Sequence, residues 1–176
     1  MHEILETKPP STLVVGSTGQ DGTLLCRSLV KKGRSVVGTS RSFVDDEMDW
    51  PTFKLNYLNK SEVENFLEAK GFSEIYFLGA QSSVAKSFEE PHDTFFSNTI
   101  PILNVLDWIK RNSPSTKFFH ASSGEIFGTQ LNPANEATQY SPLSPYAVSK
   151  LAATELVKNY RTAYGIFAVN GILFNH

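Results

Sequence analysis

Three glycines in one short turn constrain this chain more than any other part of its sequence. Gly16, Gly19 and Gly22 follow a β-branched apolar run at residues 12–15 and precede leucines at helical spacing, so the turn joins a strand to a helix. Gly16 can adopt the tight turn that leaves the strand, and Gly19 lets a diphosphate approach the backbone. Gly22 lets the helix pack closely against the sheet. The helix start adds free N–H groups and a positive dipole end. This pattern favours a dinucleotide site; because its spacing departs from the commoner G-x-G-x-x-G, an ordinary glycine turn is the alternative.

Composition limits the remaining possibilities. The 176 residues, 40% hydrophobic and 19% charged, are typical of one soluble globular domain. The net charge of −2 gives no electrostatic reason to expect nucleic acid or membrane as a partner. The one cysteine, Cys26, excludes an internal disulfide and a two-cysteine metal site; we interpret it as a buried apolar residue and predict no metal site. There is no signal pattern or long apolar run, so we expect a cytoplasmic protein.

Strands and helices alternate along the chain. Strands are expected at residues 12–15, 35–39, 53–55, 75–78, 117–121 and 166–172, and helices at 22–32, 61–71, 93–111 and 144–164. Pro101 either begins the third helix or kinks it. The alternation predicts a Rossmann-type doubly wound parallel sheet, an α/β fold, spanning residues 11–176 after a flexible tail at residues 1–10. Ligands in this fold lie beyond the carboxyl ends of the strands.

Capping residues mark several helix ends. Ser61 and Glu64 have the spacing of a capping box, and Gly71 ends that helix. Ser144 is expected to cap the last helix, with Pro145 at its first position and Gly165 as its terminator. An irregular loop is expected at residues 128–143.

The end of the second strand carries Arg41. An acidic residue here would bind the ribose hydroxyls of NAD, whereas an arginine can pair with a 2′-phosphate. No acidic residue lies between Val36 and Val44, so the sequence favours NADP. An exposed loop arginine is the alternative.

Polar residues also follow the third and fourth strands. Asn56 is either an adenine ligand or a turn residue. Small residues at positions 79 and 80 let the backbone pass close to a flat cofactor, and Gln81 and Ser82 can reach a substrate unless this segment is a plain loop.

The end of the fifth strand places the hydroxyl of Ser123 two residues from the carboxylate of Glu125. The apolar neighbours Ile126 and Phe127 favour a general base at Glu125, although a solvated loop acid is the alternative. On the following helix, Tyr146 and Lys150 lie at i, i+4 on one face, so we expect the ammonium group to lower the pKa of the phenol.

Taken together, the glycine turn, Ser123 and the Tyr146/Lys150 pair resemble the extended short-chain dehydrogenase/reductase family. Within it, four stretches resemble the GDP-mannose 4,6-dehydratases: GSTGQDG at 16–22, LGAQS at 78–82, SPY at 144–146 and FAVNGILFNH at 167–176. The resemblance covers nearly all of residues 11–176.

This resemblance implies an internal redox reaction on a nucleotide sugar. Tyr146 takes the proton from the 4-hydroxyl while hydride passes from C4 to NADP⁺, and Ser123 hydrogen-bonds the same oxygen. The new 4-ketone acidifies the C5 proton, Glu125 removes that proton, water leaves from C6, and the hydride returns to C6. Lys150 completes the catalytic set, and the product is GDP-4-keto-6-deoxymannose.

The resemblance also assigns binding residues and partners. The residues expected to bind NADP are Gly16, Thr18, Gly19, Gln20, Asp21, Gly22, Arg41, Asn56, Leu78, Ala80, Tyr146 and Lys150. Those expected to bind GDP-mannose or a related nucleotide sugar are Gln81, Ser82, Ser123, Glu125 and Asn175. A homo-oligomer, dimer or tetramer, is implied as well.

The chain departs from the family pattern in three residues and in length. Ser123 replaces the usual Thr, Gly124 a Ser, and Asn56 the adenine-binding Asp. Family members continue into a smaller substrate-binding domain, so we expect a truncated chain that ends before most of that domain. The alternatives are another nucleotide-sugar epimerase or reductase, and a non-catalytic NADP-binding Rossmann protein.

Overall fold

All six strands of the sheet run parallel. The computed structural model describes residues 11–42 and 48–174, and the sheet order is β3-β2-β1-β4-β5-β6. The strands are β1 (Ser11–Val15), β2 (Ser35–Ser40), β3 (Thr52–Lys54), β4 (Glu74–Phe77), β5 (Lys117–Ser123) and β6 (Ala168–Leu173). The helices are α1 (Gln20–Lys31), α2 (Lys60–Lys70), α3 (Val84–Glu89), α4 (Pro91–Asn112) and α5 (Pro145–Tyr164), with a 3₁₀ turn η1 (Gly124–Phe127). This order confirms the predicted Rossmann-type fold, and the chain reverses direction across the sheet between β1 and β4.

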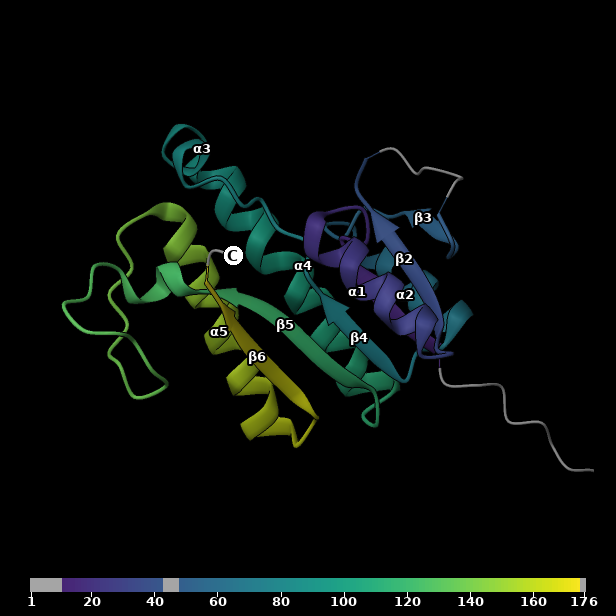
Figure 1. Ribbon diagram of the computed structural model, residues 1–176. Coiled ribbons are helices and arrows are strands. Elements are labelled where there is room, and N and C mark those ends of the chain that lie inside the picture. The colour runs from purple at the N-terminus through teal and green to yellow at the C-terminus, as the bar shows by residue number, and fades with distance from the viewer. Residues whose placement is uncertain (1–10, 43–47, 175–176) are drawn as a thin grey trace, which may run out of the picture.

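Helices lie on both faces of the sheet. Helix α1 packs over β1 and β2, and α2, α4 and α5 lie on the opposite face (Figure 1). The larger core lies under α2, α4 and α5, and a smaller one under α1 contains Val14, Val36, Trp50 and Cys26. Cys26 is fully buried, as predicted, and its burial raises the pKa of the thiol to about 12. Within the described residues, no helix covers β5 and β6 on the α1 face (Figure 1).

Three predicted helix ends, at Gly71, Ser144 and Gly165, are confirmed and one is wrong. The Ser144 hydroxyl accepts a hydrogen bond from the Ala147 N–H at 3.0 Å, and Gly165 ends α5 in the left-handed conformation. In α2, however, Asn59 is the cap: its side chain accepts from the Glu62 N–H at 3.2 Å. The helix therefore begins before Ser61, which lies inside its first turn.

Most other boundaries differ from the sequence prediction by one or two residues, and the structure contains elements that were not expected. The short helix α3 was not expected; Ser83 caps it by accepting from the Lys86 N–H. Helix α4 begins at Pro91, so Pro101 lies inside the helix, where it is buried. Strand β5 continues to Ser123, which pairs with Leu173 of β6.

None of the described helices combines the length and hydropathy that a membrane span would need.

Candidate active site

A cleft of about 740 Å³ opens beyond the carboxyl ends of the strands. Its size is usual for a cofactor site. Every residue predicted to bind the cofactor lines this cleft except Asn56. The residues that line it are Gly16, Thr18, Gly19, Gln20, Asp21, Gly22, Ser40, Arg41, Ser42, Leu78, Gly79, Ala80, Ser82, Ala121, Ser122, Ser123, Tyr146, Lys150, Leu173 and Phe174.

The glycine turn forms one wall of the cleft. Gly16 has φ +81°, which confirms its tight turn, and a Cβ there would lie 2.9 Å from the backbone nitrogen of Gly79. A Cβ on Gly22 would overlap the carbonyl oxygen of Gly16, so close helix packing requires that glycine. At Gly19 a Cβ would meet only this oxygen, at 3.4 Å. The backbone at Gly19 is therefore open to a ligand, and it leads directly into the first turn of α1.

Arg41 lies where the cleft meets a side hollow of about 350 Å³. The hollow is also lined by Lys54, Leu55, Asn56 and Glu62, so two cationic side chains border it. The side chain of Asn56 accepts a hydrogen bond from the Leu58 N–H at 3.1 Å, and its own N–H donates to Glu62 at 3.0 Å. This geometry supports the turn role of Asn56, while its contact with adenine stays a prediction.

The loop after β4 is held by hydrogen bonds. The Gln81 amide donates to Ser83 O and Thr94 Oγ1, both at 3.0 Å, so it is engaged within the protein and is absent from the cleft lining. Asn98, on α4, accepts from the Gln81 N–H at 2.8 Å and donates to its carbonyl at 3.0 Å. Ser82, in contrast, lines the cleft as the sequence predicted.

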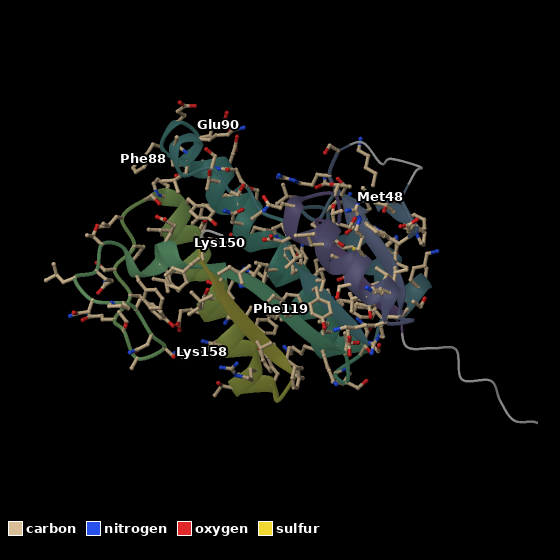
Figure 2. All side chains as sticks on the ribbon, in the orientation of Figure 1. Met48, Phe88, Glu90, Phe119, Lys150 and Lys158 are labelled. Atoms are coloured by element: carbon tan, nitrogen blue, oxygen red, sulfur yellow. The ribbon has the colours of Figure 1, made fainter. Side chains whose placement is uncertain are left out.

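Ser123, Tyr146 and Lys150 come together at the other end of the cleft. Each of these side chains is nearly buried, with 8%, 7% and 4% exposed. The ammonium group of Lys150 donates to the carbonyl of Ala121 at 2.7 Å. In Figure 2 Lys150 lies where α5 meets the ends of β5 and β6.

Burial is the main cause of the shifted pKa values of Lys150 and Tyr146. Burial lowers the pKa of Lys150 to about 8. Burial raises the pKa of Tyr146, a hydrogen bond with Ser123 lowers it, and the Glu125 charge raises it. The expectation that Lys150 lowers the pKa of Tyr146 is therefore wrong for the protein alone. The phenol is shielded from water, and the Lys150 ammonium faces the Ala121 carbonyl.

Glu125 is exposed at the start of η1, although its neighbours Ile126 and Phe127 are buried. Its backbone N–H donates to the Ser123 hydroxyl at 3.2 Å, which fixes the turn. The apolar neighbours therefore do not enclose its carboxylate, contrary to our expectation. The charge of the carboxylate still contributes to the raised pKa of the Tyr146 phenol.

The sequence prediction missed one residue that holds the loop after β4. Asn98 is buried yet lies on the same helical stripe as Ile102 and Val105, and a polar residue in such a stripe was a signal that could have identified it. Asn175, predicted to contact the sugar nucleotide, lies outside the described residues, as does the tail at residues 1–10.

Solved structures with the same fold are nucleotide-sugar epimerases, among others. A UDP-Glc/GlcNAc 4-epimerase from Campylobacter jejuni aligns with a TM-score of 0.84 and 19% identity, over 94% of this chain and 53% of its own. A UDP-glucose 4-epimerase from Brucella ovis in complex with NAD aligns with a TM-score of 0.83 and 22% identity, over 94% and 51%. At these identities the likeness shows the fold.

Sequence relatives identify the family. GDP-mannose 4,6-dehydratases from Vibrio cholerae, Yersinia enterocolitica and Homo sapiens are 39%, 40% and 39% identical, each over 93% of this chain and 49% of its own length. The chain thus spans about half the length of the curated relatives it matches. The profile of the family described as GDP-mannose 4,6 dehydratase matches residues 13–176. The chain belongs to the GDP-mannose 4,6-dehydratase family.

Proposed function

We propose that the protein containing these residues converts GDP-mannose to GDP-4-keto-6-deoxymannose and water. The observation that carries this proposal is the single cleft. Its glycine turn and Arg41 lie at one end, and Ser123, Tyr146 and Lys150 at the other. This arrangement fits an extended dinucleotide whose phosphates lie at the start of α1 and whose reactive ring lies beside Tyr146. The named activity of the family relatives supports the same substrate.

The chain's own residues supply the acid–base chemistry of the first half. When bound, NADP⁺ would accept hydride from C4 of the hexose and later return it to C6. Tyr146 accepts the proton of the 4-hydroxyl, and Ser123 donates a hydrogen bond to the same oxygen. Because burial raises the pKa of Tyr146, the phenolate needs a positive charge beside it. Lys150, one helical turn away, supplies that charge when it is protonated.

Glu125 acts in the second half. The ketone at C4 makes the C5 proton acidic, and the Glu125 carboxylate removes it. The 6-hydroxyl then leaves as water, so one C–H bond and one C–O bond break as the C5–C6 double bond forms. Glu125 does not itself line the cleft, but it lies two residues beyond Ser123, which does, and its exposure leaves the carboxylate accessible to a bound hexose.

The activity is tested on the full reading frame that contains these residues, incubated with GDP-mannose and NADP. We expect GDP-4-keto-6-deoxymannose as the product. A 4-epimer or a 6-hydroxylated ketone would instead identify an epimerase or oxidoreductase of the same fold. Full biological function in a Tyr146→Phe variant would indicate a non-catalytic NADP-binding protein.

We expect Arg41 to select NADP over NAD. A guanidinium paired with a 2′-phosphate contributes about 1.5–3 kcal/mol, or about one to two decades in affinity. Titration calorimetry on the 176-residue chain measures both cofactors. Arg41→Met should weaken NADP binding and leave NAD binding unchanged, whereas Arg27→Met, on the exposed side of α1, should change neither. Equal wild-type affinities for the two cofactors would contradict this assignment.

We also propose that the chain self-associates as a dimer or tetramer. A groove of about 380 Å³ lies between α4 and α5, and its lining is mainly apolar. The lining residues are Phe95, Thr99, Ile100, Leu103, Ala152, Glu155, Leu156 and Asn159. Covering such a surface with a second copy removes apolar area from water, which favours association.

The cytoplasmic location stays a prediction.

Leu103→Gln should weaken this self-association by about tenfold, because it places an amide in the apolar groove. Sedimentation velocity over a range of concentrations measures the effect. Leu131→Gln is the matched control, since Leu131 is fully exposed in a loop away from the groove. A monomeric wild-type chain, or equal effects of the two variants, would rule out this interface.

A further inference from the structure

A network of four polar side chains, three of them buried and Asn170 partly buried, connects α5 with β5 and β6. Ser122 and Thr154 hydroxyls lie 2.6 Å apart, and the Thr154 hydroxyl donates to the Lys150 carbonyl at 2.8 Å. Asn170 donates to the Thr154 carbonyl at 3.1 Å and contacts the His120 Nδ1 atom at 2.8 Å. His120, Ser122 and Thr154 are each less than 5% exposed.

The donor and the acceptor of each hydrogen bond in this network can be assigned. The Thr154 hydrogen points to the Lys150 carbonyl, so Ser122 must donate to the Thr154 oxygen. The Asn170 amide donates to the Thr154 carbonyl, so its own oxygen accepts from the His120 Nδ1–H. The Nε2 atom of His120 is buried without a partner, but each of the four hydrogen bonds has a fixed donor and acceptor, which favours a single arrangement of these elements.

This network surrounds the hydrogen bond that the Lys150 ammonium group donates to the Ala121 carbonyl. His120, Ala121 and Ser122 are consecutive on β5, and they are tied to Asn170, Lys150 and Thr154, respectively. Ser123, the hydroxyl of the proposed active site, comes next. The network therefore fixes the register between the turn of α5 that carries Lys150 and the strand that carries Ser123.

Apolar packing alone does not fix this register. Ala153 and Val157 bury the same face of α5, but apolar contacts are not directional and tolerate small sliding. The hydroxyl of Thr154 adds one directional bond between the helix and the strand, with Ser122, and a second bond to the Lys150 carbonyl within α5 that fixes the orientation of the hydroxyl. From this geometry, and resting on the proposed function, we propose that Thr154 is a positioning residue for Lys150 and Ser123 at the nicotinamide half of the cofactor site.

The proposal predicts an effect confined to one half of the cofactor. The adenosine half is assigned to the glycine turn and Arg41, which belong to β1, α1 and the end of β2. Thr154 touches neither. Thr154→Val keeps the shape and removes both hydroxyl bonds. It should weaken NADP and NAD binding by about three- to tenfold each and leave the binding of 2′,5′-ADP, which carries only the adenosine half, unchanged.

The test is titration calorimetry on the 176-residue chain with these three ligands. Thr154→Ser keeps the hydroxyl and should restore the wild-type affinities. Thr162→Val is the matched control, because Thr162 makes the same bond to the carbonyl four residues earlier, at 3.0 Å, on the exposed part of α5. If Thr154→Val does not fold, Ser122→Ala removes only the 2.6 Å bond and should show the same split between ligands.

The outcomes separate this inference from the proposed function. Wild-type chain that binds neither NADP nor NAD would overturn both. If the wild-type chain binds the cofactors, two results for the folded Thr154→Val variant would overturn the positioning role. One is unchanged affinity for NADP and NAD, and the other is an equal loss of affinity for 2′,5′-ADP. Either result would leave the proposed function intact.

Discussion

Replacing Glu125 with glutamine in the full reading frame should lower turnover of GDP-mannose by about two to four decades, the usual contribution of a general base. Glutamine keeps the shape of the side chain but cannot accept the C5 proton. Oxidation at C4 needs only Tyr146, Lys150 and Ser123, so the first half of the reaction should proceed. The near-ultraviolet absorbance of reduced nicotinamide should therefore rise on mixing and persist.

Two variants control this experiment. Glu136→Gln changes another exposed acid, in the loop before α5, and should turn over at the wild-type rate. Tyr146→Phe removes the first base, so the absorbance should not rise at all. If Glu125→Gln turned over at the wild-type rate, the C5 base would have to be another residue.

Local sequence signals predicted most of the fold because each lies within a short stretch of chain. The glycine turn, the Ser144 cap and the Gly165 terminator all hold at the predicted positions. The sequence did not predict helix α3, because this helix has only six residues and buries only Ser87. Its sequence therefore has no apolar periodicity that would indicate a helix. At α2 both Asn59 and Ser61 have capping side chains. The turn after β3, where the Asn59 N–H donates to the Asn56 carbonyl, decides between them.

The site was predictable where topology alone assembles it. Residues that follow parallel strands meet at one edge of the sheet, so Arg41, Ser123 and Tyr146 line one cleft. Side-chain orientation was not predictable, because it depends on partners distant in sequence. Gln81 is held by Thr94 and Asn98, and Lys150 is held by Ala121. Burial, and then the charge of Glu125, explain why the pKa of Tyr146 moves opposite to the expected direction.

Replacing His120 with glutamine should remove a large part of the acid sensitivity of the fold. Burial, and then the charge of Lys150, lower the pKa of His120 to about 3, against 6.5 in the unfolded chain. Between these values the unfolded state binds more protons than the folded state, so stability is complete above pH 6.5 and is lost as pH falls toward 3. The loss reaches about 2 kcal/mol at pH 5 and roughly 4 kcal/mol near pH 3.

Urea unfolding at pH 7 and pH 5 measures this loss. The free energy of unfolding of wild-type chain should fall by about 2 kcal/mol more than that of His120→Gln, because a glutamine amide can still donate to Asn170 but has no proton to gain. His92→Gln, at an exposed histidine, should follow the wild-type curve. Lys150→Met removes the neighbouring positive charge, raises the pKa of His120 and should shrink the loss. Identical pH dependence in wild-type and His120→Gln chains would mean that the ring takes up its proton without unfolding, which its burial at 1% exposure argues against.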